Sequence, residues 1–310
     1  MGQNCTMYSP ESQDSTISEE QKDLLESNKV KILLLSEIHT KLSIEEDKIS
    51  EDPSSKVEES SKDNSETTTG DNKPEKRPEK ELPNGAKYNG EWVGDQRHGY
   101  GTQIWKDSSK YEGEWRYDKA NGLGILFHAD GDVYEGSWKD DKAHGKGVYT
   151  HANGARYEGD WDLDKQHGVG VETWPDGARF SGEYRDGKKN GKGELLFADG
   201  SKYNGSFCSN EINGYGEYLW TDGKNYVGYW EHNKMSGHGK LQWADGKSYE
   251  GFFAEDKRKG FGIFQWGDGR RYEGMWKSGK QHGQGKFTTA SGDTKQGIWK
   301  NGKREKWLNE

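Results

Sequence analysis

The sequence predicts an all-β fold, an elongated single-layer antiparallel β-meander of ten 23-residue hairpins. A word of the form aromatic-x-Gly-x-aromatic returns every 23 residues, from YNGEW at 88–92 to a degenerate KQGIW at 295–299. Between these words lie Gly-x-Gly segments with the period-two alternation typical of strands. Hydrophobic residues make up only 28% of the 310, which favours a one-layer repeat array over a compact core.

The first 80 residues differ in composition from the rest of the chain. They hold no tryptophan and carry 19 acidic against 11 basic side chains, which accounts for −8 of the net charge of −9. The remainder is almost balanced, with 35 acidic and 34 basic side chains. Neither part has the basic excess that nucleic-acid binding requires, so we expect no nucleic-acid partner.

Residues 1–17 form a candidate lipid-anchor segment. The opening MGQNCT matches the acceptor pattern for N-myristoylation at Gly2. A single myristoyl chain binds membranes only marginally, and Cys5 is placed to carry a second acyl chain, a palmitate. The alternative is an ordinary disordered start. No secretory signal is present, so we expect an intracellular protein.

Two further segments precede the repeats. Within residues 18–50 a capping box at Ser18–Gln21 is followed by spaced Leu, Ile and Val residues, which predicts an amphipathic helix that docks on the sheet or on a partner. Residues 51–81 are rich in Ser, Glu, Lys and Pro and are predicted to be a disordered acidic linker. The repeat domain is then expected to span 82–310.

Each repeat contains a turn word, Asp-Gly or Asn-Gly, after its second strand. Examples are Asp130-Gly131 and Asn153-Gly154. Such pairs supply the positive φ angles that tight hairpin turns demand, which predicts tight hairpins at these positions. Asp107-Ser108 lacks the glycine, and we expect a strained or longer turn there.

A glycine separates the two aromatic side chains of each word because all three residues share one face of the strand. Tyr111, Gly113 and Trp115 point the same way, and two large rings fit there only if the position between them has no side chain. Stacked at the 23-residue period, they predict a structural aromatic ladder. Its members are Tyr88, Trp92, Tyr111, Trp115, Tyr134, Trp138, Tyr157, Trp161, Trp220, Trp243, Trp266 and Trp276.

The pattern Tyr-x-Gly-x-Trp, then Gly-x-Gly, then Asp-Gly resembles the MORN (membrane occupation and recognition nexus) repeat family over residues 84–302. The resemblance implies a twisted, grooved sheet used as a scaffold near membranes or the cytoskeleton. Members in radial-spoke heads and in membrane scaffolds are similar. The last copy, with Lys295 in place of tyrosine, is predicted to be a cap.

Two polar ladders each have two interpretations. His98, His144, His167 and His282 share one phase and could bind a metal, but Asn121 or Lys259 fill the same slot, so we expect backbone hydrogen bonds, no metal and no cofactor. Lys87, Lys110, Arg156, Arg179, Lys202 and Arg271 could meet lipid headgroups or a partner. Glutamates beside that ladder favour pairing on a solvated face instead.

No catalytic constellation stands out, so we expect no enzymatic activity. The first hypothesis is a lipid-anchored scaffold that organises partner proteins at a membrane–cytoskeleton junction, on the cytoplasmic side. The second is a structural subunit of a ciliary assembly such as the radial spoke head in the axoneme, and the third is a phosphoinositide-binding module. Partners are expected along the aromatic groove, and a homodimer through the edge strand Gln296–Trp299 of the last repeat.

Overall fold

The computed structural model describes residues 73–308, and these form one 21-stranded antiparallel sheet. The predicted segments at 1–17 and 18–50 lie outside the described residues. The strands are β1 (Glu75–Glu81), β2 (Lys87–Val93), β3 (Gln96–Ile104), β4 (Lys110–Arg116), β5 (Lys119–Phe127), β6 (Val133–Lys139), β7 (Lys142–Thr150), β8 (Arg156–Asp162), β9 (Lys165–Thr173), β10 (Arg179–Arg185), β11 (Lys188–Leu196), β12 (Lys202–Cys208), β13 (Glu211–Leu219), β14 (Asn225–Glu231), β15 (Lys234–Gln242), β16 (Ser248–Ala254), β17 (Lys257–Gln265), β18 (Arg271–Lys277), β19 (Lys280–Thr288), β20 (Thr294–Lys300) and β21 (Lys303–Trp307).

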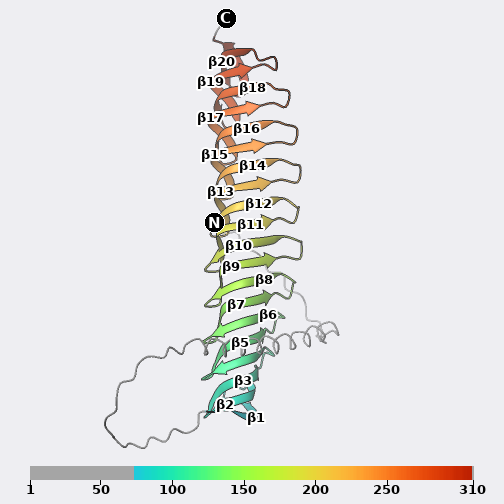
Figure 1. Ribbon diagram of the computed structural model, residues 1–310, viewed down its shortest axis with the longest axis vertical. Coiled ribbons are helices and arrows are strands. Elements are labelled where there is room, and N and C mark those ends of the chain that lie inside the picture. The colour runs from blue at the N-terminus through green and yellow to red at the C-terminus, as the bar shows by residue number, and fades with distance from the viewer. Residues whose placement is uncertain (1–72, 309–310) are drawn as a thin grey trace, which may run out of the picture. The chain divides into compact units, whose positions relative to one another are not determined.

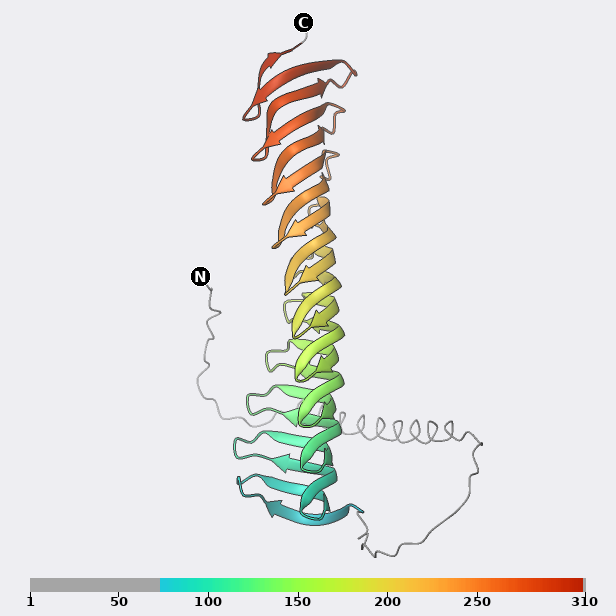
Figure 2. The ribbon, with the colours of Figure 1, turned by 90° about the vertical axis from the view of Figure 1, so that its left-hand side faces the viewer.

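Every strand pairs with the next strand along the chain, from β1 to β21 (Figure 1). The strands twist progressively along the stack (Figure 2), as expected from strand chirality. The predicted all-β meander of hairpin repeats is confirmed. Among the described residues, no helix is long and apolar enough to cross a bilayer.

The sheet begins earlier than the sequence predicts. Strand β1 lies within residues 51–81, which the composition predicts to be linker. Its charged side chains remain mostly exposed, but Arg77 and Lys80 cover the ring of Trp92, at 5.7 and 5.0 Å from the ring centroid. Pro78 and a bulge between Arg77 and Lys80 interrupt the pairing, which protects this edge from adding further strands.

The sheet also ends later than predicted. Residues 296–299, expected to be the exposed edge, pair with β21 as part of β20. The basic segment that follows, Lys303–Trp307, is therefore itself the edge strand. Trp307 packs against Trp299 with ring centroids 5.9 Å apart, and Arg304 lies 4.2 Å over the Trp307 ring.

The turns that follow the aromatic words and the turns at the Asp-Gly words differ in geometry. Between β4 and β5, Tyr117 and Asp118 have φ angles of 48° and 67°, the two positive values of a type I′ turn. At the Asp-Gly words only the glycine is left-handed, as at Gly131 with φ 94°, and its N–H donates to the carbonyl of His128 over 3.1 Å. These words therefore close tight hairpins, as predicted, but only the glycine of each pair supplies a positive φ angle. A type I turn followed by a left-handed glycine closes the hairpin because its loop is one residue longer.

The turn without glycine keeps the common length and is strained, because Ser108 takes a φ of 71° where other repeats have glycine. The Oδ1 of Asp107 accepts the N–H and the hydroxyl of Ser109, at 3.0 and 2.6 Å, as Asp199 does with Ser201 in a turn that has glycine.

We expect Ser108→Gly to stabilise the protein by about 0.5–1 kcal/mol, because glycine adopts this conformation without the Cβ penalty but loses more chain entropy. Urea denaturation of both proteins measures the change. Gly177→Ser is the mirror control, since a Cβ there meets no atom within 4 Å, and it should destabilise by a similar amount. A loss of stability in Ser108→Gly would contradict the assignment of strain.

The core is a single layer of rings lying over a row of glycines. Gly113 pairs with Gly101 on one side and Gly124 on the other, and equivalent pairs continue from strand to strand as far as Gly297. The Tyr111 ring lies over this row, so close that a Cβ on Gly124 would be 2.4 Å from Tyr111 Oη. The glycines therefore make the space that the rings occupy.

Edge-to-face contacts join the rings into a continuous zigzag. The Tyr111 ring centroid lies 5.0 Å from Trp115 of its own strand and 5.3 Å from Trp138 of the next repeat, with nearly perpendicular planes. The polar atoms of these two rings are satisfied, since Tyr111 Oη donates to the carbonyl of Glu114 over 2.9 Å and Trp115 Nε1 donates to that of Gly101 over 3.1 Å. These contacts join the rings of neighbouring repeats along the array.

Candidate functional site

The candidate site is the aromatic groove, which we define as the face of the sheet that carries the Tyr and Trp rings. Its floor is the buried zigzag, to which Tyr88, Trp92, Tyr111, Trp115, Tyr134, Trp138, Tyr157, Trp161 and Trp276 belong. Trp220, Trp243 and Trp266 lie one row away, half-buried at the ends of β13, β15 and β17, and pack against the floor. This second row offers ring surface to a ligand.

One further position in each repeat also faces the groove. It is the second residue of each nine-residue strand, and it pairs directly across from the floor ring, as Arg97 does with Trp92. We call it the groove slot, and its occupants from β3 to β19 are Arg97, Ala120, Ala143, Gln166, Lys189, Ile212, Met235, Arg258 and Gln281. The slot is cationic at three of these places.

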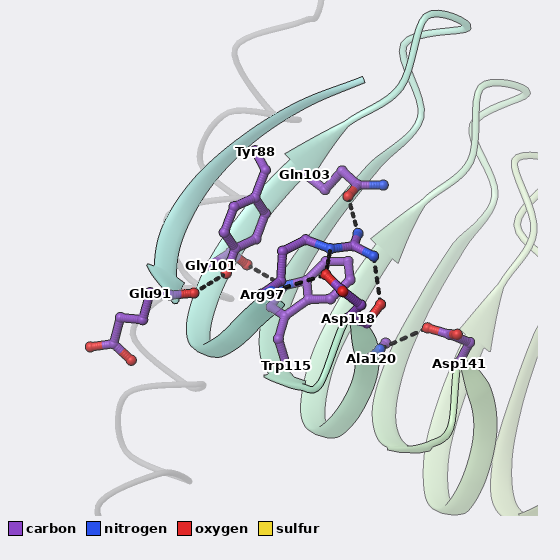
Figure 3. A network of polar contacts seen from close by, with 9 residues as sticks. All are labelled: Tyr88, Glu91, Arg97, Gly101, Gln103, Trp115, Asp118, Ala120 and Asp141. Atoms are coloured by element: carbon purple, nitrogen blue, oxygen red, sulfur yellow. Dashed lines mark hydrogen bonds and ion pairs between the residues drawn. The ribbon is translucent and has the colours of Figure 1, made fainter. Parts of the chain in front are cut away.

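At the first cationic slot, Arg97 is fully paired within the chain (Figure 3). Its guanidinium stacks 4.2 Å over Trp115, and its Nε lies 3.1 Å from Asp118 Oδ1. The remaining nitrogens bond to the side chain of Gln103 and to the carbonyl of Asp118. A hollow of about 580 Å³ lies beside it, lined by Trp105, Tyr111 and Trp138 among others.

At the second cationic slot, the charge of Lys189 is also neutralised by a carboxylate of the chain. Its Nζ lies 2.6 Å from Glu172 Oε2, and the Tyr184 hydroxyl donates to the same carboxylate oxygen over 2.9 Å. The ammonium stands 4.8 Å over Trp174 of the second row. Both charges of this pair are largely buried against the rings.

At the third, Arg258 stacks 4.4 Å over Trp276 and approaches the rings of Tyr249 and Phe264. Its burial among these rings lowers the pKa of the guanidinium below its ordinary value. Within residues 73–308, no carboxylate or hydrogen-bond acceptor meets this guanidinium.

The type I′ turns clasp each repeat to the one before. The N–H of Asp118 donates to the carbonyl of Arg97 over 3.0 Å, and Asp118 Oδ1 accepts the N–H of Arg97 at 2.9 Å. The Asp141 carboxylate accepts the N–H of Ala120 in the same way (Figure 3). Where the turn has glycine, as at Gly279, the side-chain half of the clasp is missing. Sequence reasoning missed this contact, although Asp, Asn or Gly recurs there at the repeat period.

The predicted basic ladder lies on the opposite, outward face, and most of it is neutralised. Lys87 lies 3.5 Å from Glu79, Lys110 3.1 Å from Glu112, Arg156 2.8 Å from Glu158, and Arg271 3.1 Å from Glu273. Three of these pairs join residues two apart in one strand, where cross-strand pairs were expected. Arg179 and Lys202 form no ion pair with any residue of 73–308.

The histidines of the shared phase do not gather into a metal site. Among residues 73–308, no three potential metal ligands cluster. The backbone hydrogen bonds expected of them are not made by the buried Nδ1 atoms of His98, His144 and His282. His144 Nδ1 lies 3.2 Å from Asp162 Oδ1 without hydrogen-bond alignment.

The outward face carries an aromatic patch over β13–β18 that the sequence analysis did not single out. Tyr215, Tyr229, Phe252, Phe261 and Met275 are each about half exposed. Tyr215 pairs across strands with Tyr229 at a ring distance of 5.3 Å, Phe261 pairs with Met275, and Phe252 pairs with His238. The signal available in the sequence was that two positions 14 residues apart are both apolar in only two pairs, 215 with 229 and 261 with 275.

Comparison with known proteins identifies the repeat. The family model described as MORN repeat matches residues 88–110, 111–133, 134–156, 157–179, 180–202, 203–224, 226–248, 249–270, 272–294 and 296–305. No curated protein matches the chain.

Among solved structures, the TCP10 domain of Danio rerio CPAP is 11% identical, with 70% of this chain and 96% of that one covered and a TM-score of 0.37. The SAS-4 (dCPAP) TCP domain of Drosophila melanogaster, in complex with a proline-rich motif of Ana2, is 14% identical over 61% and 95% of the two chains, with a TM-score of 0.30. Likeness at this level carries no argument about function.

Proposed function

The chain belongs to the MORN repeat family, whose members are repeat scaffolds associated with membranes or the cytoskeleton, and from this premise we propose a non-enzymatic scaffold. It binds partner proteins along the aromatic groove and is held at the cytoplasmic face of a membrane by acyl chains on Gly2 and Cys5. The observation that supports it best is the groove itself, a buried floor beside a half-exposed row of rings.

The groove has the chemistry of a protein-binding surface. Trp, Tyr and Arg dominate the binding energy of protein interfaces, and all three line this face. The floor is already ordered by ring contacts and hydrogen bonds, so a partner does not have to order it on binding. The variable groove slots then distinguish one stretch of the array from another.

The anchor is tested by Gly2→Ala, which removes the myristate acceptor. We expect this variant to leave the membrane fraction, whereas Cys5→Ser should retain weak, reversible binding because one myristoyl chain gives an association constant of only about 10⁴ M⁻¹. Fractionation together with myristate and palmitate labelling measures both. Asn4→Ala, inside the same motif, is the control and should behave as the parent.

Unchanged membrane association of Gly2→Ala would contradict the anchor. Release of the parent protein by high salt or axoneme disruption, and not by detergent, would support the second hypothesis of a fixed subunit in a cytoskeletal or ciliary assembly.

Direct phosphoinositide binding by the outward ladder rests on Arg179 and Lys202, since the other four cations are paired. In the Gly2→Ala background, salt-sensitive binding to phosphoinositide vesicles that disappears in Arg179→Gln with Lys202→Gln would support it.

We further propose that two copies of the chain pair at the C-terminal end, through the edge strand β21. Because Lys303, Arg304 and Lys306 are exposed on this strand, the pairing should strengthen as salt screens their repulsion. Sedimentation of the full chain at low and high salt measures it, with a chain ending at Gly274 as the monomeric reference. A monomeric mass for the full chain at every salt concentration contradicts the dimer.

A further inference from the structure

The groove slots at Arg97 and Arg258 are seven repeats apart and can be compared position by position. Both guanidinium groups stack on the floor tryptophan of the following repeat, at 4.2 Å from the Trp115 ring and 4.4 Å from the Trp276 ring. Their other neighbours differ: the position of Gln103 is taken by Phe264, and that of Asp118 by Gly279. In both sites the guanidinium therefore stacks on a tryptophan ring. The sites differ in the groups that accept hydrogen bonds from the guanidinium.

These differences remove every side-chain acceptor that Arg97 uses. At Arg97, Asp118 supplies the carboxylate and Gln103 the amide oxygen. At Arg258, Phe264 contributes only a ring, at 5.3 Å, and Gly279 has no side chain. A guanidinium carries five N–H donors. Those of Arg258 have no acceptor among residues 73–308 and are not fully buried, so they can bind an acceptor on a ligand.

The surroundings of Arg258 favour an anionic, partly aromatic ligand. A hollow of about 270 Å³ beside it is lined by Phe264, Trp266, Trp276 and Lys280. Residues 257–310 contain 13 Lys and Arg against five acidic residues, in a chain that is otherwise acidic. Because the guanidinium is half-buried among rings, a slender side chain reaches it and a flat bilayer surface does not.

We propose that Arg258 binds a carboxylate side chain of an acidic, aromatic-containing protein segment that lies extended in the groove. The carboxylate takes the place that Asp118 fills at Arg97, and a neighbouring aromatic side chain of the ligand packs on the partly exposed ring of Trp266. This proposal rests on the proposed scaffold function and deepens its partner-binding half.

A substitution in the chain itself can place a carboxylate beside Arg258 and so test the proposal. Gly279 has a φ of 77°, close to the 67° of Asp118, and a Cβ added there meets no atom within 4 Å. Gly279→Asp should therefore reproduce the Arg97 pairing at Arg258. Gly279→Asn is the matched control, because its amide restores the turn clasp without adding a charge.

The probe is a fluorescein-labelled heptapeptide, Glu-Phe-Glu-Phe-Glu-Phe-Glu, with the all-Gln analogue as its neutral counterpart, measured by anisotropy on the full chain. The parent should bind the Glu peptide about tenfold to a hundredfold more tightly than the Gln peptide, as expected for a charge-assisted hydrogen bond. Arg258→Gln and Gly279→Asp should each remove that preference. Gly279→Asn and Arg97→Gln should retain it.

The proposal is overturned if the parent shows no preference for the Glu peptide, or if Arg97→Gln loses it as fully as Arg258→Gln. Circular dichroism and the melting temperature check that each variant is folded. Phosphatidylserine vesicles are a second probe, in the Gly2→Ala background. Arg258-dependent binding to these vesicles that the peptide does not displace assigns the site to lipid and overturns the protein ligand.

Failure of this site is distinguishable from failure of the scaffold. If Arg258→Gln keeps all partners that co-purify with the parent while a Trp220→Ala, Trp266→Ala double variant loses them, the groove binds proteins but not through Arg258. If neither variant changes the co-purifying partners, partner binding in the groove itself is wrong.

Discussion

Gly216→Ala is expected to destabilise the protein by about 3 kcal/mol or more, the upper range for overpacking a core. A Cβ on Gly216 would lie 2.3 Å from the Oη and 2.5 Å from the Cζ of Tyr203. The ring cannot move aside, because Phe207 and Trp230 meet it edge-on at 5.2 and 5.7 Å and its hydroxyl donates to the carbonyl of Ser206. The added methyl group therefore has to break the ring layer in mid-array.

Chemical denaturation of Gly216→Ala measures the loss, and Gly187→Ala is the matched control. Gly187 has a φ of 77° with no atom within 4 Å of an added Cβ, so alanine there carries only the conformational cost of about 1–2 kcal/mol. Equal losses in the two variants would show that backbone conformation, and not the ring, requires glycine at 216. Because repeats contact only their neighbours, Gly216→Ala should also split the unfolding transition.

The second large effect is unfolding at alkaline pH. Burial raises the pKa of Tyr203 and Tyr272 from 10.0 to about 12, and it raises those of Tyr134 and Tyr226 further. The folded state therefore favours the neutral phenol, so its stability is fully present below pH 10 and is lost as the pH rises through 12. A pKa displaced from 10 to 12 corresponds to about 3 kcal/mol for each tyrosine, and the ladder contains several.

Absorbance of tyrosinate and far-ultraviolet circular dichroism, followed together from pH 9 to 12.5, measure this transition. We expect ionisation and loss of strand signal to coincide, because a phenolate cannot stay under the rings. Phe180 already fills one rung of the ladder without a hydroxyl, so Tyr203→Phe should fold and should unfold at higher pH than the parent. Ionisation that is complete while the sheet remains intact would contradict the assignment.

The fold was predictable because its determinants repeat. The 23-residue period sets the hairpin length, and the alternation around Gly113 sets which face the rings occupy. The turn geometry was not predictable in this way. Asp-Gly is compatible with both a two-residue type I′ loop and a longer loop ending in a left-handed glycine, and the choice depends on pairing between strands. Nothing local marks Tyr117 as left-handed, since the Asp118 clasp to Arg97 is a contact between repeats.

The candidate site was only partly predictable, for the opposite reason. The repeat period identifies the positions at which the residue type stays constant, and these positions form the floor of the groove. What distinguishes Arg258 from Arg97 is a change at two other positions, Phe264 and Gly279, that meet it only through pairing across strands. The sequence also does not separate Trp220 and Trp266 from the tryptophans of the floor, although these two lie in the second row.

Because the strands pair strictly in sequence, equivalent positions in the groove recur at a constant distance. Each repeat adds two strands, or about 9.6 Å, and this is the distance between one groove slot and the next. Arg97 and Lys189 are four repeats apart, about 38 Å, and Lys189 and Arg258 three repeats, about 29 Å. An extended chain advances about 3.3 Å per residue, so a ligand lying along the array needs about nine residues to pass from Lys189 to Arg258. A partner is then selected by the interval between its anchoring side chains as well as by their chemistry.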